Sequence, residues 1–171
     1  MQEIRRQLTL FINQPDGNIE RIRSKYNHVQ FNLIPAHVTL CREDEIEPIE
    51  KTIERLESIS MNAPIHIDFG KVERFSSGKG VFIPPVGENK GFTQLRQLAL
   101  GQTDLIKKQI PHITLMHPRN STCDSEIFRH IQKYELPAKL EFRKISLIEQ
   151  INGGKWNVLQ EFDITNSNVA N

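Results

Sequence analysis

The sequence predicts an α+β protein with a bilobal, duplicated fold: two antiparallel-rich sheets with flanking helices, and a pseudo-twofold groove between the lobes. Two observations predict it. The pattern His-x-Thr-Leu occurs twice, in PAHVTLCR at 35–42 and in PHITLMHP at 111–118, each time inside an apolar, strand-like segment. The order strand, helix, His-x-Thr strand, helix, strand also occurs twice, over residues 5–75 and over residues 80–151. Such a repeated order indicates an internal duplication.

In the first half, apolar residues recur at the period of a strand or of a helix. The expected elements are strands over 6–13, 36–42 and 64–75 and helices over 18–26 and 44–58. Ile19 and Ile22 share one side of the first helix. Acidic residues and Pro48 suit the first turn of the second helix, where the helix dipole favours negative charge. A turn at 15–17 separates the first strand from the first helix.

The second half follows the same order of elements. We expect strands over 80–87, 111–118 and 139–151, helices over 91–100 and 123–134, and a closing strand over 155–164. The serine- and glycine-containing segment 76–79 predicts a β-hairpin that joins 64–75 to 80–87. Asn-Gly-Gly at 152–154 predicts a second hairpin between the last two strands.

Length and charge restrict the domain organisation and the partners. We expect residues 1–165 to form a single bilobal domain and residues 166–171 to be a frayed tail. Because 22 Lys and Arg stand against 21 Asp and Glu, the formal net charge is only +1. That charge is too small to hold long double-stranded nucleic acid through counterion release. A nucleic-acid partner should therefore be short.

Apolar segment length and cysteine spacing predict the cellular location of the protein. No apolar run reaches the length of a signal peptide or of a membrane span, so we expect a cytoplasmic protein without a membrane partner. We also expect a monomer. Cys41 and Cys123 lack the spacing of a zinc site, and a reducing compartment would keep them as thiols.

The two motifs should present their polar side chains on one face. Because side chains two residues apart share a face of a strand, His37 lies beside Thr39, and His112 lies beside Thr114. The apolar residues between them belong to the core. Two imidazoles and two hydroxyls make a small pocket that suits an anion. Neutral and protonated imidazole coexist near neutral pH, so a pair of histidines can act as base and acid at phosphorus.

At these residues the sequence resembles the two-histidine (2H) phosphoesterase superfamily, and within it the bacterial proteins named for 2'-5' RNA ligase activity. The resemblance also includes LTLFI in the opening strand, FGKVERF at 69–75 and the closing KISLIEQINGGKWNVLQEF. It implies a bilobal α+β fold and metal-independent chemistry, without a cofactor, at cyclic or 2'-5' phosphodiesters. It implies catalysis by His37 and His112, with Thr39 and Thr114 holding the phosphate.

Other residues are candidates for contacts outside the phosphate. Arg42 and Arg119 follow the motif strands and could bind the far side of a nucleotide, or they are solvated charges at strand ends. Phe82 and Tyr26 could stack on a base, although an aromatic residue in such a position is more often part of the core.

His117 raises a metal alternative, because His112, His117 and a third ligand could in principle bind zinc. Against it, His117 has the strand parity of Ile113 and Leu115, and Pro118 ends the strand. We therefore expect no metal.

The expected function is a phosphodiesterase that opens 2',3'-cyclic phosphates of RNA ends or of small cyclic nucleotides, with possible reverse 2'-5' RNA ligase activity. Two alternatives remain open. One is a non-catalytic module that binds phosphate or RNA ends, and the other is a phosphodiesterase for 2'-5' oligonucleotides. Which histidine is the acid stays open as well.

Overall fold

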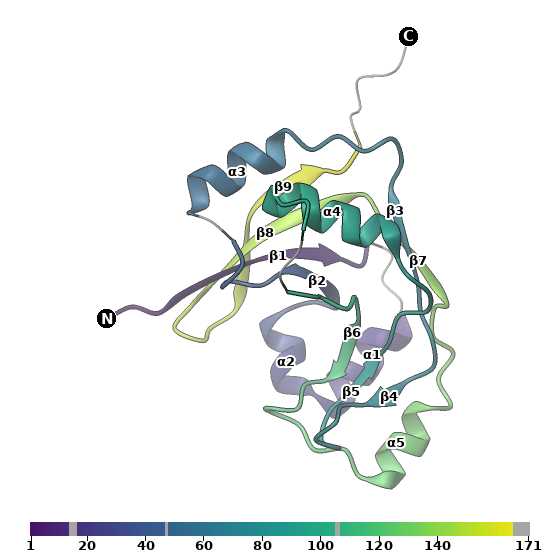
Figure 1. The fold of residues 1–171 in the computed structure, drawn as a ribbon. Helices are drawn as coiled ribbons and strands as arrows, with labels where there is room; N and C mark the ends of the chain where they lie inside the picture. Colours follow the sequence, from purple (N-terminus) through teal and green to yellow (C-terminus); the bar gives the residue numbers. More distant parts are fainter. Residues whose placement is uncertain (14–16, 47, 105–106, 166–171) are drawn as a thin grey trace.

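The computed structural model describes residues 1–13, 17–46, 48–104 and 107–165 (Figure 1). The expected tail at 166–171, and most of the expected turn at 15–17, lie outside the described residues. The strands are β1 (Ile4–Phe11), β2 (His37–Cys41), β3 (Ile65–Asp68), β4 (Glu73–Arg74), β5 (Val81–Ile83), β6 (Ile113–Met116), β7 (Lys139–Phe142), β8 (Lys144–Ile151) and β9 (Trp156–Asp163). The helices are α1 (Gly17–Tyr26), α2 (His28–Leu33), α3 (Ile49–Glu57), α4 (Lys90–Leu100) and α5 (Ser125–Ile131).

The order of strands in the sheets shows the duplication. The larger sheet has seven strands in the order β4-β5-β6-β2-β1-β8-β9, and the smaller sheet pairs β3 with β7. Counted from the β6–β2 boundary, β6 corresponds to β2, β5 to β1 and β4 to β8. In the chain, β1-α1-β2-α3-β3-β4 and β5-α4-β6-α5-β7-β8 are the same series, apart from the extra helix α2 between α1 and β2. The predicted α+β duplicated fold is confirmed, with β9 as an added edge strand.

The pseudo-twofold axis passes between the two motif strands. Val38 of β2 pairs antiparallel with Ile113 of β6, and each is the residue directly after a motif histidine. Continuing this register by one residue sets His37 opposite Thr114 and His112 opposite Thr39. Equivalent residues therefore meet at the centre of the sheet.

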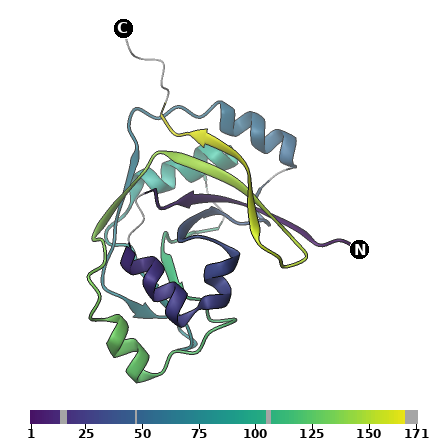
Figure 2. The same cartoon turned by 180° about the vertical axis from the view of Figure 1, so that it is seen from behind.

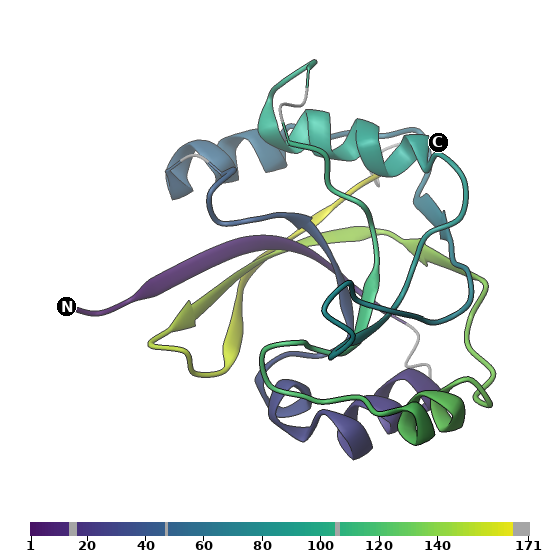
Figure 3. The ribbon, with the colours of Figure 1, turned by 60° about the horizontal axis from the view of Figure 1, so that its bottom comes forward.

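The helices cross over between the repeats. In Figure 3, α3 and α4 lie on one side of the strands, and α1, α2 and α5 lie on the other. α1 of the first repeat packs on β6 of the second, as Figure 2 shows from behind, and α4 of the second repeat packs on β2 of the first. Each motif strand is thus covered by a helix from the other half of the chain.

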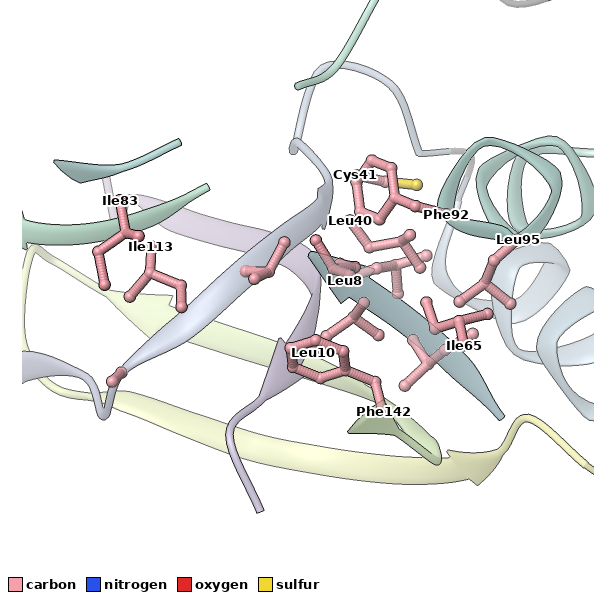
Figure 4. Close-up of a cluster of buried hydrophobic side chains, with 14 of the residues drawn as sticks. Leu8, Leu10, Leu40, Cys41, Ile65, Ile83, Phe92, Leu95, Ile113 and Phe142 are labelled. Atoms are coloured by element: carbon pink, nitrogen blue, oxygen red, sulfur yellow. The ribbon is translucent and has the colours of Figure 1, made fainter. Parts of the chain in front are cut away.

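The core beneath α4 joins strands of both sheets. Figure 4 shows Phe92 and Leu95 of α4 facing Leu40 of β2, with Phe142 of β7 on the far side of the same cluster. All four side chains are buried. Removing this apolar surface from water stabilises the arrangement by roughly 1.5–3 kcal/mol for each large side chain.

The helix predicted over 44–58 begins later, at Ile49, and Pro48 stands at its N-cap instead of in its first turn. The reason lies in the preceding turn. The Glu45 carboxylate accepts a hydrogen bond from the Arg42 backbone N–H at 2.8 Å and pairs with the buried Arg96 guanidinium at 2.7 Å. These contacts hold Glu45 in a turn and keep it out of a helix.

The hairpin predicted between 64–75 and 80–87 is only partly correct. β4 pairs with β5, and the predicted pairing continues through a bridge between Phe69 and Pro85 and a hydrogen bond from the Val86 N–H to the Asp68 carbonyl at 2.8 Å. The strand β3 itself pairs with β7, with Ile65 opposite Phe142. β3 packs against α4, and its residues Ile65 and Ile67 are buried. The predicted strand over 139–151 is accordingly divided into β7 and β8.

The hairpin predicted at 152–154 is confirmed between β8 and β9. Asn152 and Gly153 have φ values of 50° and 69°, the left-handed conformation that a tight two-residue turn between twisted strands needs.

Gly80 offers a test of packing beside the second motif strand. A Cβ at this position would lie 2.5 Å from the Met116 carbonyl oxygen and 2.7 Å from Cδ2 of Phe75. Because one of these atoms is backbone, Gly80→Ala should lower the free energy of unfolding by about 1–3 kcal/mol, measured by denaturant titration.

Gly17→Ala is the matched control, since a Cβ there meets nothing within 4 Å. Equal stability of the two variants would contradict the close approach of the β4–β5 turn to β6.

Candidate active site

Four polar side chains lie half-buried on one face of the two motif strands, and the residues between them are fully buried. The polar residues are His37, Thr39, His112 and Thr114, and the buried ones are Val38, Leu40, Ile113 and Leu115. The structure therefore confirms the predicted alternation of polar and buried apolar side chains along both motif strands. Through the β2–β6 register, the two imidazoles and the two hydroxyls alternate around the pseudo-twofold axis.

Both imidazoles are oriented by the same hydrogen bond. Nδ1 of His37 lies 2.8 Å from the Pro35 carbonyl oxygen, and Nδ1 of His112 lies 2.9 Å from the Ile110 carbonyl oxygen. A carbonyl oxygen only accepts, so Nδ1 carries the proton in both rings and the neutral form has its lone pair on Nε2. Within the described residues, neither Nε2 has a hydrogen-bond partner. Each histidine can take a proton at Nε2 without changing tautomer.

Aromatic rings flank each histidine and limit its movement. The Phe11 ring meets His37 edge-on at 6.2 Å between centroids, and Phe82 and Phe75 meet His112 edge-on at 5.7 and 6.0 Å. Phe11 lies opposite His37 in the β1–β2 pairing, and Phe82 lies opposite Thr114 in the β5–β6 pairing. The neighbouring strands thus supply apolar walls that exclude water from one side of each imidazole.

These surroundings favour the neutral form of both histidines. The pKa of His37 is lowered to about 4: burial is the main cause, the Pro35 carbonyl opposes it, and the positive charges of Arg23, His112 and His117 add to the decrease. Burial also lowers the pKa of His112, again against a carbonyl, and the Arg42 guanidinium adds to the decrease. In the free protein at neutral pH, both rings are therefore proton acceptors. A bound phosphate anion would raise both pKa values.

The threonine hydroxyls remain available to a ligand. Among the described residues, neither the Thr39 nor the Thr114 hydroxyl has a hydrogen-bond partner, and both side chains are half-buried. Because a hydroxyl both donates and accepts, each can donate to an anionic oxygen placed between the imidazoles.

A buried arginine on the helix before each motif holds the chain that leads into it. The Arg23 guanidinium of α1 donates to the Ile34 carbonyl at 2.6 Å and pairs with Glu20 at 2.8 Å. Glu20 in turn accepts from the Ala36 backbone N–H at 2.7 Å, directly before His37. These contacts fix the backbone from which the first catalytic candidate extends.

Arg96 of α4 occupies the matching place in the second repeat. Its guanidinium donates to the Lys107 carbonyl at 3.0 Å, to the Leu40 carbonyl, and to Glu45. It thereby connects the segment before the second motif with the end of the first motif strand. Sequence reasoning missed both arginines, although they stand at the same position relative to two buried apolar residues: Ile19, Ile22 and Arg23 in α1, and Phe92, Leu95 and Arg96 in α4.

The other predicted site residues divide into two groups. Phe82 contacts His112, and Arg42 is exposed and close enough for its charge to act on His112. Arg119 is exposed and acts on His117 in the same way. Tyr26 is engaged elsewhere: its hydroxyl is hydrogen-bonded to Nδ1 of His130 in α5. A role for these residues in binding substrate stays a prediction.

Two absences concern the described part of the chain. No group of three or more His, Cys, Asp or Glu residues in it is arranged to hold a metal ion. None of its helices has the length and apolar character that crossing a membrane requires.

The fold has solved counterparts. E. coli LigT in its apo form aligns with a TM-score of 0.62 at 14% identity, over 96% of this chain and 99% of that one. E. coli LigT complexed with 3'-AMP aligns with a TM-score of 0.57 at 13% identity, over 95% and 98% of the two chains. TT0787 of Thermus thermophilus aligns with a TM-score of 0.58 at 16% identity, over 95% and 99%. At these identities the likeness shows a shared fold.

The sequence itself supplies the assignment to a family. A search of curated proteins finds no match. A family model described as the 2'-5' RNA ligase superfamily matches residues 12–154, a range that contains both His-x-Thr motifs and most of the chain. The 2H resemblance predicted from the two motifs is confirmed, and this chain belongs to the 2'-5' RNA ligase superfamily.

Proposed function

We propose that this protein is a metal-independent phosphodiesterase that opens ribose 2',3'-cyclic phosphates by paired-histidine catalysis. The observation that carries the proposal is the symmetric pair of imidazoles, each with Nδ1 hydrogen-bonded to a carbonyl and with no hydrogen-bond partner for Nε2 among the described residues. A single histidine on a strand usually has a structural role. Two histidines related by an axis can act as an acid and a base on opposite sides of one bound anion.

In the proposed reaction, one neutral motif histidine takes a proton from water as the water oxygen forms a bond to phosphorus. The other histidine, protonated, donates its proton to the ribose oxygen as the phosphorus–oxygen bond to that oxygen breaks. The products are a phosphomonoester and a free ribose hydroxyl, and the two imidazoles have exchanged protonation states. Thr39 and Thr114 donate to the non-bridging oxygens while charge develops on them.

The substrate class rests on charge and on the relatives. A net charge of +1 favours short ligands over long nucleic acid. E. coli LigT has been solved with 3'-AMP, with phosphate and with ATP. We infer that this chain likewise takes small nucleotides or the ends of short RNA. The same groups run in reverse would join a cyclic phosphate to a hydroxyl and form a 2'-5' linkage.

Two alternatives would use the same groove. A 2'-5' oligonucleotide phosphodiesterase needs the same acid and base but a different pocket for the base. A binding module needs neither imidazole to change its protonation state, and the matched orientation of both rings favours the enzyme. We still expect the protein to act as a monomer in the cytoplasm.

Replacing either motif histidine should slow turnover strongly. His37→Ala and His112→Ala should each lower kcat by about 10²–10⁴-fold, because each removes one proton-transfer group. The measurement is a phosphorus NMR time course with nucleoside 2',3'-cyclic phosphates and a 2'-5' dinucleotide in EDTA.

His66→Ala is the control, since His66 lies on β3 of the small sheet. Full activity in either motif variant would rule out the paired mechanism. Saturable binding by the wild type without turnover would favour the binding module.

Removing a motif hydroxyl should slow the reaction while the fold is kept. Thr39→Val and Thr114→Val are nearly isosteric and suit a strand, so we expect a decrease of about 10²-fold in kcat for each, as for loss of one donor to a developing oxyanion. Thermal unfolding should change little. An unchanged kcat would show that the hydroxyls do not touch the phosphate.

The rate should depend on pH with a maximum on the acid side of neutrality. In the free protein one imidazole must be neutral and the other protonated, and both pKa values lie below the ordinary 6.5, that of His37 at about 4. The profile of kcat/KM should therefore fall below about pH 4 and fall again as pH rises towards 6.5, whichever histidine is the acid. A flat profile between pH 5 and 8 would contradict the assignment.

A further inference from the structure

The peptide unit between Pro35 and Ala36 is hydrogen-bonded at both ends. Its carbonyl oxygen accepts the Nδ1–H of His37 at 2.8 Å, and its N–H, which belongs to Ala36, donates to Oε1 of Glu20 at 2.7 Å. Because a trans peptide is planar, its N–H and its C=O point in opposite directions. One peptide plane therefore carries a continuous series of hydrogen bonds from the Glu20 carboxylate to the His37 imidazole.

The carboxylate at the start of this series is held by a buried arginine. The Arg23 guanidinium is 2% exposed and lies 2.8 and 2.9 Å from the two carboxylate oxygens of Glu20. It also donates at 2.6 Å to the Ile34 carbonyl, which belongs to the preceding peptide unit. Ala36 is buried as well, so its N–H is shielded from water. In such surroundings, hydrogen bonds that share a peptide unit strengthen one another by polarisation.

The second motif has the same kind of anchor without a carboxylate behind it. The Ile110 carbonyl lies 2.9 Å from Nδ1 of His112, but this carbonyl shares its peptide unit with Pro111, whose nitrogen has no hydrogen. No carboxylate can therefore be linked to His112 through the N–H of that unit. The two motif histidines thus differ in what stands behind their anchors.

We propose that Glu20 is a positioning residue for His37, which acts through the peptide unit between Pro35 and Ala36, and that no carboxylate acts on His112 in this way. A carboxylate that accepts from the N–H shifts electron density towards the carbonyl oxygen and makes it a stronger acceptor for the Nδ1–H. The stronger bond keeps the proton on Nδ1 and the lone pair on Nε2, the atom that exchanges protons in the proposed reaction. The inference rests on the proposed function for its effect on the rate, and its effect on the tautomer is independent of it.

The test compares two substitutions that interrupt the series with one that does not. Glu20→Gln keeps an acceptor near the Ala36 N–H but removes its charge, and Ala36→Pro removes the N–H and copies the second motif. Glu45→Gln is the matched control, because Glu45 also pairs with a buried arginine, Arg96, and also accepts from a backbone N–H, that of Arg42. Among the described residues, no imidazole is hydrogen-bonded to the carbonyl of the peptide unit that Glu45 holds.

NMR of nitrogen-15-labelled protein at neutral pH measures the tautomer of each imidazole. In the wild type and in Glu45→Gln we expect the proton of His37 on Nδ1. In Glu20→Gln and Ala36→Pro the Nε2–H form of His37 should become detectable, whereas the tautomer of His112 should not change. With a nucleoside 2',3'-cyclic phosphate, kcat of these two variants should fall about tenfold and KM should change by less than about twofold, as for loss of an outer partner of an essential histidine.

The tautomer and the rate separate failure of this inference from failure of the proposed function. An unchanged His37 tautomer in Glu20→Gln and Ala36→Pro would overturn the inference, even with a loss of kcat. An equal change at His112 would also overturn it, because it would indicate a general loosening of the groove. If the wild type shows no turnover, the proposed function fails, and the tautomer of His37 in Glu20→Gln still decides the inference. Should one of the two variants not fold, the other decides the same question.

Discussion

The antiparallel pairing of Val38 with Ile113 is the constraint on which the site depends. It joins the two repeats at equivalent residues, so the axis relates each residue of one motif strand to its counterpart on the other. The histidines of the two halves come together only because of this register. A shift by one residue would turn the polar face of one strand into the core and would break both the apolar interior and the groove. Packing and chemistry are therefore specified by the same contact.

Within this symmetric frame, the groove is made unequal by a few side chains. The motif imidazoles have the same anchor, the same tautomer and an aromatic neighbour each, yet the cation whose charge acts on His112 is the exposed Arg42, whereas the one that acts on His37 is the buried Arg23. The loops leading into the motifs are also held differently: Glu20, the partner of Arg23, comes from the same helix, whereas Glu45, the partner of Arg96, comes from the turn after β2. In the proposed reaction, such differences would allow two like residues to take the unlike roles of acid and base.

Local sequence was enough to predict the duplicated fold and the shared face of the four polar motif residues, because alternation along a strand sets which side chains share a face. It did not predict the anchors at Nδ1, since those are backbone carbonyls of one proline and one isoleucine, Pro35 and Ile110, with no side-chain signal. The buried arginines were missed because arginine is normally exposed. The pairing of β3 with β7 was missed because it is set by α4, which lies far from β7 in the chain.

The crossing of the helices has a consequence for how such a protein could arise. Since α1 covers the motif strand of the second repeat and α4 covers that of the first, a chain with one repeat alone would expose the apolar face of its helix and of its strand. Two copies of that chain would cover each other completely and would place one histidine from each on a true twofold axis. A homodimer of single repeats would thus keep both strands covered, and holding the two repeats in one chain lets their sequences differ.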